Sequence, residues 1–129
     1  IWDGPQITFT KVDGADPDLE ENQDRITDNV WITRANNGGQ IYNAKSESTA
    51  NKTTSPAGTK WAEGTVDQIE SLMFSNFRTA VGEPQDVVGK NLVMYLEEDD
   101  VYLSVSFSSW SRGNQNQGGF AYTRSTNPN

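Results

Sequence analysis

The chain has 129 residues, 18 acidic and 10 basic, and its formal net charge is -8 at pH 7. This length fits one domain, and we expect residues 1–129 to form a single unit. The negative charge argues against nucleic acid and anionic membrane surfaces as partners, and no apolar run is long enough to predict membrane insertion.

Histidine and cysteine are both missing from the sequence. Their absence excludes thiolate metal sites, the usual zinc ligands, and every nucleophile that depends on a histidine base. Gly38-Gly39 and Gly118-Gly119 lack the spacing of a phosphate-binding loop. Carboxylate pairs alone could support glycoside hydrolysis, but among 18 acidic residues such a pair arises by chance. We therefore expect a protein that is not an enzyme.

The first third of the chain predicts three strands. Residues 7–12 alternate β-branched and aromatic side chains and end at Asp13-Gly14, a turn signal. Residues 15–28 form a long acidic loop, and residues 29–34 form the second strand, in which Val30 and Ile32 share one face. The run from Asn36 to Gly39 predicts a tight turn into a third strand over residues 40–43.

The middle of the chain is less regular. Residues 45–58 are polar and predict a surface excursion, and residues 60–62 predict a short strand. In residues 66–81 the apolar positions fit a helical stripe, but a strand fits as well, and the neighbouring elements favour a strand. Residues 82–89 form a connector that contains Pro84.

The last third has the strongest strand pattern. Residues 92–96 are apolar, residues 97–100 form an acidic turn, and residues 101–108 place every second side chain on one apolar face. A Gly/Asn/Gln loop over residues 112–119 leads to a last strand over residues 120–124. Seven to eight short strands without a dependable long helix predict an all-β fold, an antiparallel β-sandwich of jelly-roll type.

The acidic loop is a candidate calcium site. Ca²⁺ binds six to eight hard oxygen ligands, and carboxylates crowd this part of the chain. The candidate ligands are Asp13, Asp16, Asp18, Glu20 and Asp24. The spacing does not match an EF-hand, and a solvated acidic loop is the alternative. Arg34 and Arg124, each at the end of its strand, could pair with these carboxylates in a purely structural role.

Aromatic side chains are candidates for a glycan-binding surface. Sugars present C–H patches that pack on flat rings and hydroxyl groups that bond to polar neighbours. The candidate ligand-binding residues are Trp110, Tyr102, Arg112, Tyr122 and Trp31. For each aromatic residue the alternative is simple burial in the core.

Several stretches resemble a poorly characterised β-rich domain of secreted, often multidomain, bacterial proteins. They are ITFTK (7–11), NQDRIT (22–27), NVWITR (29–34), SPAGT (55–59) with Trp61-Ala62, and FAYTR (120–124). The resemblance implies an exported protein and a β-rich fold. It brings no established activity and no catalytic residue.

Together these observations predict a non-catalytic extracellular binding module, secreted or at the cell surface. Calcium would stabilise it, and its partner would be a carbohydrate or a surface polymer, neutral or cationic because the domain is acidic. The alternative is a structural subunit or adhesin domain that binds another protein chain or itself, for instance by pairing through an edge strand.

Overall fold

The computed structural model describes residues 1–51, 53–112 and 117–129. The strands are β1 (Ile7–Lys11), β2 (Asp24–Arg25), β3 (Trp31–Arg34), β4 (Ile41–Asn43), β5 (Thr59–Glu63), β6 (Leu92–Leu96), β7 (Val101–Trp110) and β8 (Phe120–Arg124). The helices are short: η1 (Glu20–Asn22), η2 (Val66–Ser71), α1 (Phe77–Val81) and η3 (Pro84–Asp86). Among the described residues, none of the helices has the length and apolar composition that crossing a bilayer requires.

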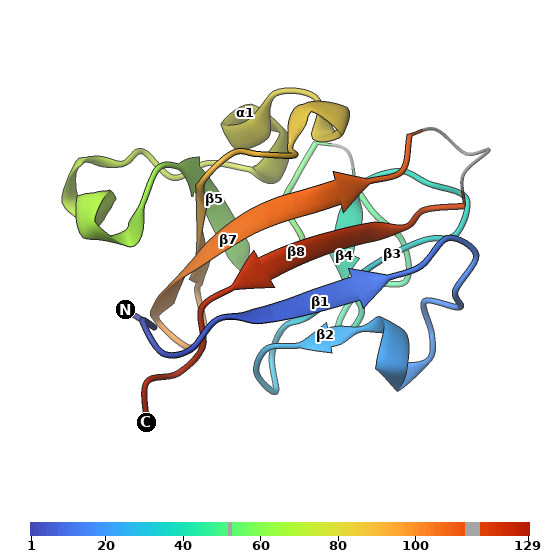
Figure 1. Cartoon of the computed structure of the whole chain (residues 1–129), viewed down its shortest axis with the longest axis horizontal. Helices are drawn as coiled ribbons and strands as arrows, with labels where there is room; N and C mark the ends of the chain where they lie inside the picture. The colour runs from blue at the N-terminus through green and yellow to red at the C-terminus, as the bar shows by residue number, and fades with distance from the viewer. Residues whose placement is uncertain (52, 113–116) are drawn as a thin grey trace.

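The strands form two antiparallel sheets (Figure 1). The large sheet has the order β1-β8-β7-β6-β5, and the small sheet has the order β2-β3-β4. The expectation of an all-β antiparallel fold is confirmed. Strands β5 to β8 follow one another as a meander with β1 added at the edge, so the strand order does not confirm the jelly-roll connection.

The core is built from side chains that alternate along the strands. In β7, Leu103, Val105 and Phe107 are buried, as the alternation in the sequence predicts. Val30, which directly precedes β3, and Ile32 of β3 join the same apolar cluster. Further members come from β5, β6, β8 and α1, so the core fills the space between the sheets and extends under α1.

The strand expected over residues 66–81 is wrong. The segment forms η2 and α1 with an extended stretch between them, of which only Ser75 makes an isolated bridge to Trp61. Local capping explains the helices: Thr65 and Gln68 form a capping box at η2, and the Asn76 side chain accepts a hydrogen bond from the Thr79 backbone at α1. The apolar residues form neither a strand nor one continuous helical stripe: Phe77 is buried in α1, whereas Met73 lies between the helices and is 90% exposed.

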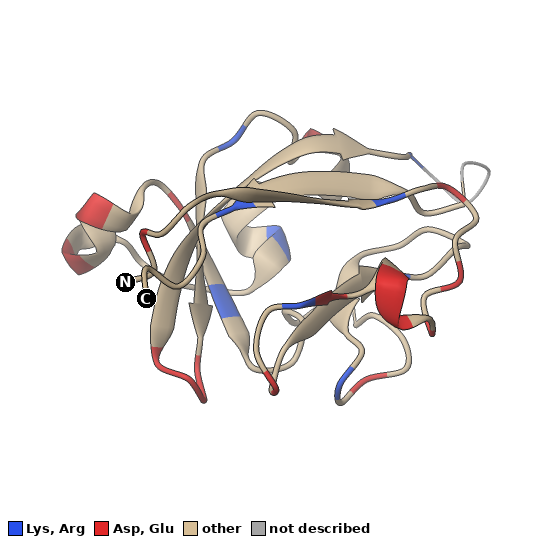
Figure 2. Cartoon of the chain, turned by 60° about the horizontal axis from the view of Figure 1, so that its bottom comes forward, with Lys and Arg blue, Asp and Glu red and all other residues tan. Residues whose placement is uncertain are grey.

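Charged residues are unevenly divided between strands and connections (Figure 2). Of the 18 acidic residues only Asp24 and Glu63 lie on strands, whereas five of the nine basic residues that the structure describes do. Among these, Lys11, Arg34 and Arg124 are buried. The interior of this acidic domain is thus locally richer in cations than in carboxylates.

One buried ion pair joins the two sheets. Asp24 of β2 accepts hydrogen bonds from Arg124 of β8, at 2.7 Å from Nε and 3.0 Å from Nη2, and from the Tyr122 hydroxyl. Burial lowers the pKa of Arg124, but the hydrogen bonds and charge of Asp24 outweigh it and hold that pKa above its ordinary value. The expected pairing of Arg124 with the acidic loop is therefore confirmed, and its partner is Asp24.

Candidate functional site

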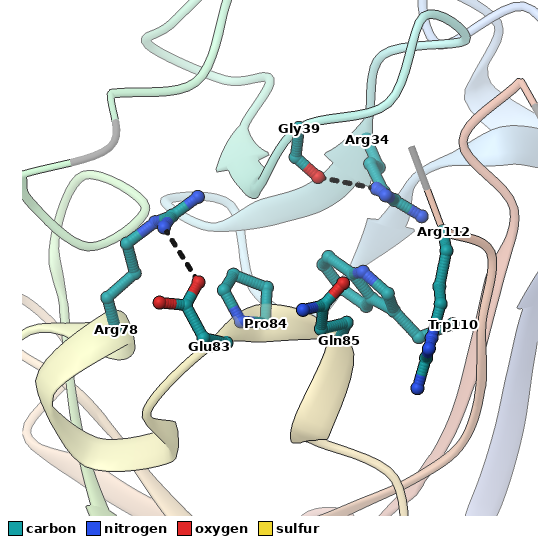
Figure 3. A pocket seen from close by; sticks show the side chains of 8 residues that line it. All are labelled: Arg34, Gly39, Arg78, Glu83, Pro84, Gln85, Trp110 and Arg112. Carbon is teal, nitrogen blue, oxygen red and sulfur yellow. Dashed lines mark hydrogen bonds and ion pairs between the residues drawn. The ribbon is translucent and has the colours of Figure 1, made fainter. Parts of the chain in front are cut away.

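A pocket of about 160 Å³ lies where the ends of β3 and β7 meet the segment from α1 to η3 (Figure 3). Its lining residues are Arg34, Gly39, Arg78, Glu83, Pro84, Gln85, Trp110 and Arg112. Larger and shallower hollows exist, such as one of about 470 Å³ beside residues 53–60, but among the described residues of its lining Lys60 is the only cationic one. The smaller pocket combines three guanidinium groups with an indole, so it is the strongest candidate site.

Arg34 enters this pocket because of its position on β3. It is two residues beyond Ile32 and therefore points to the same inner face of the small sheet. Its Nε donates to the Gly39 carbonyl at 2.6 Å and its Nη1 to the Gly119 carbonyl at 2.9 Å. The side chain is almost completely buried, and its guanidinium lies 3.9 Å from the ring centroid of Trp110. Neutral carbonyls and an aromatic face thus hold this cation in place.

The charge of Arg34 is poorly compensated. Within the described part of the chain, its guanidinium makes no ion pair within 4 Å, unlike that of Arg124. Burial lowers its pKa to about 10, and the charge of Asp13 offsets only part of this effect. Arg34 is still protonated at neutral pH and carries a desolvated positive charge at the pocket.

A β-bulge brings Trp110 to the same place. The pairing of β7 with β8 shifts between Phe107 and Ser109, so one extra residue is inserted into β7. Without the bulge, Trp110 would share the outer face with Tyr102; with it, the indole turns inward and packs against Phe107 at 5.8 Å between ring centroids. The indole also packs against Phe77 and Phe120, so the core fixes its position.

The opposite side of the pocket comes from α1 and η3. Arg78 of α1 lies 3.8 Å from the Glu83 carboxylate through Nη1, and its buried Nε has no hydrogen-bond partner among the described residues. Figure 3 shows Arg78 and Glu83 on this side, Gln85 drawn over the Trp110 indole, and Arg112 on the other side. The site therefore presents mainly hydrogen-bond donors and positive charge, with Glu83 as its single carboxylate.

The structure separates the five residues predicted to bind a ligand. Trp110 and Arg112 line the pocket together. Tyr102 lies elsewhere on the large sheet, stacked on Tyr95 with 4.5 Å between ring centroids. Trp31 is half-buried between two cations, with the Arg25 guanidinium 3.8 Å and the Lys45 ammonium 4.9 Å from its ring centroid.

Tyr122 requires a correction. It is completely buried between the sheets and bonds to Asp24, so it has no free face for an exposed sugar platform. Its alternation with Phe120 on β8 already indicated that it shares the inner face.

The predicted metal ligands have separate partners. Asp24 binds Arg124, and Asp13 accepts hydrogen bonds from the Ser111 hydroxyl at 2.6 Å and from the Gly119 backbone at 2.8 Å. Asp16 caps a turn by accepting from the backbone of Asp18 at 2.9 Å, and Glu20 forms an exposed ion pair with Arg25. Over residues 1–51, 53–112 and 117–129, no three acidic side chains are grouped as a metal would require. Calcium binding stays a prediction.

Sequence reasoning missed four lining residues with polar side chains, Arg34, Arg78, Glu83 and Gln85, besides Gly39 and Pro84. The signal for Arg34 was present, because its spacing from Ile32 places it on the inner face. No comparable signal exists for the other three, since the conformation of residues 66–86 brings them there.

A scan of protein-family models finds no match to the chain, and no curated protein and no solved structure matches it significantly.

Proposed function

We propose that the domain is a non-catalytic extracellular binding module that recognises a carbohydrate or surface polymer at the pocket around Trp110. The observation that carries this proposal is the juxtaposition of a core-fixed indole with the polar groups of Arg34, Arg78 and Gln85. An apolar ring beside convergent polar groups suits a sugar, which is amphipathic in the same way. The pocket is smaller than a typical site for a drug-sized ligand, so it would hold one sugar unit or substituent of a longer chain.

The test is a glycan-array screen with three forms of the domain. Gln85 is exposed on η3, so Gln85→Phe narrows the pocket without disturbing the core. Gln6→Phe makes the same change at an exposed position outside this pocket. We expect the wild type and Gln6→Phe to bind the same glycans and Gln85→Phe to lose them, with unchanged thermal unfolding. A folded wild type that binds no glycan would refute the proposal.

A second candidate function is assembly through β1. This strand is at the edge of the large sheet and pairs with β8 alone. Ile7 is 42% exposed, and Val12, which directly follows the strand, is 64% exposed. An open edge with apolar side chains can pair with another chain. If this function holds, light scattering shows oligomers that Ile7→Lys abolishes. A wild type that stays monomeric at high concentration, alone and with added partner proteins, would exclude assembly through this edge.

A further inference from the structure

The pocket around Trp110 carries an excess of positive charge that the acidic composition of the chain does not predict. Arg34, Arg78 and Arg112 contribute three positive charges against one negative charge from Glu83, so the lining has a net charge of +2 in a chain of net charge -8. The Arg78–Glu83 pair is long, at 3.8 Å, and the Glu83 side chain is 67% exposed, so solvent weakens it. Glu83 therefore compensates little of this charge.

The donors of the pocket outnumber its acceptors. Arg34 uses Nε and Nη1 on carbonyl groups, and its Nη2 bonds to none of the residues that the structure describes. The same holds for the buried Nε of Arg78. A buried donor without an acceptor costs about 1–3 kcal/mol, and more when it is charged. A ligand that brings an acceptor to Arg78 would recover this free energy, and Arg34 offers its Nη2 as a further donor.

Arg124, which is also a buried arginine between the sheets, shows which kind of acceptor suits a buried guanidinium group. Arg124 is held by the two carboxylate oxygens of Asp24 through two nearly parallel N–H···O bonds. A planar carboxylate matches the fork of a guanidinium in this way, and the resulting bonds are stronger than those to neutral acceptors. Arg34 is buried to a similar degree, but its hydrogen-bond partners among the described residues are both carbonyl groups.

We infer that the pocket binds the carboxylate of an acidic sugar, with Arg34 and Arg78 as its anchors. This inference rests on the proposed function and specifies its ligand class as a polysaccharide that contains uronic acid. A pocket of about 160 Å³ has room for a carboxylate and part of its sugar ring. The rest of the polymer lies outside, near Gln85 and Arg112. The net charge predicted a neutral or cationic partner, and this inference departs from that expectation because the local charge of the site is positive.

The experiment is calorimetric titration of the folded domain with an oligomer of galacturonic acid and with its methyl ester. The ester keeps the sugar rings and removes the negative charge. A hydrogen bond to a charged group contributes about 1.5–3 kcal/mol, so the ester should bind on the order of ten to a hundred times more weakly. The affinity of the acid should also fall as salt concentration rises, because the interaction is ionic.

Two arginine variants complete the test. Arg78→Gln removes one anchor and should weaken binding of the acid about tenfold and that of the ester clearly less, because the ester has no charge to lose. Arg25→Gln is the matched control, because Arg25 lies on Trp31, is not part of the pocket lining, and its loss should change neither affinity. Thermal unfolding of each variant reports whether it is folded.

The outcomes separate this inference from the proposed function. Equal binding of acid and ester, with no effect of Arg78→Gln but loss in Gln85→Phe, would keep the glycan pocket and overturn the carboxylate. Tighter binding of dextran sulfate than of the uronic acid oligomer, lost in Arg78→Gln, would also overturn the carboxylate and assign a sulfate instead. Absence of binding to every saccharide would overturn both.

Discussion

Asp24→Asn should destabilise the domain strongly. The substitution removes the negative charge between Tyr122 and Arg124 and leaves the Arg124 guanidinium buried without its counter-ion. Side-chain exposure of the pair is only 7% for Arg124 and 6% for Asp24, so water replaces little of the lost interaction. Removal of one partner from a buried ion pair costs about 3–5 kcal/mol. For a domain of this size, that corresponds to a fall in the unfolding midpoint on the order of 10–20 °C.

Urea unfolding followed by tryptophan fluorescence measures this cost. The matched control is Glu20→Gln, which breaks an exposed ion pair with Arg25 and should cost at most about 1 kcal/mol. A third variant, Asp24→Leu with Tyr122→Phe and Arg124→Met, replaces the whole buried group by apolar side chains. It should recover most of the stability, since such replacements are often neutral or stabilising. If Asp24→Asn costs no more than Glu20→Gln, the ion pair does not hold the sheets together.

Three further predictions concern the acidic loop and the Gly118 turn. Gly118→Ala should lower the free energy of unfolding more than Gly89→Ala does. Both residues have positive φ, but a Cβ at Gly118 would lie 1.9 Å from the Ala35 carbonyl, whereas a Cβ at Gly89 would meet nothing within 4 Å. Chemical denaturation of the two variants measures this difference. The pKa of Asp13 is lowered, first by the Ser111 hydrogen bond and then by that of the Gly119 backbone. The ionised Asp13 carboxylate therefore stabilises the fold above its ordinary pKa of 3.8, and this stabilisation is lost as pH falls through the lower pKa of the folded state. An unfolding curve for Asp13→Asn that keeps the acid sensitivity of the wild type would contradict this assignment. If residues 13–24 bind calcium, Ca²⁺ raises the unfolding midpoint above that measured in chelator, and equal midpoints discard the metal.

The strands could be predicted well from the sequence where buried and exposed side chains alternate, because this alternation is a local property of each strand. In β7 the period of two separated Leu103 and Val105 from the outward-facing Tyr102, and the pairing of β3 with β4 followed from the Gly38-Gly39 turn. The strand order depends on contacts between distant segments, such as β1 with β8, and no local pattern reports it.

The site was only half predictable, for two physical reasons. Trp110 was expected in a binding surface with Arg112, but the bulge that turns it inward depends on the register with β8, which the spacing within β7 does not encode. Asp24 carries a carboxylate, which is a common metal ligand, yet its pairing with Ile32 in the small sheet directs this side chain towards Arg124. In both cases the partner strand decides the role of the side chain.

The pairing of β1 with β8 also determines how the domain responds to tension. Ile7 and Arg124 are the first rung of this antiparallel pair, and the chain leaves the pair from both residues at the same end of the sheet (Figure 1). A force that pulls residues 1 and 129 apart therefore first loads the hydrogen bonds of Trp2 and Gly4, and then the rungs of β1 and β8 one after another from Ile7 and Arg124. Each rung contributes only about 1 kcal/mol, so the strands should peel apart like a zipper under a small force. As a link in a tethered chain, the domain would yield early and lengthen gradually.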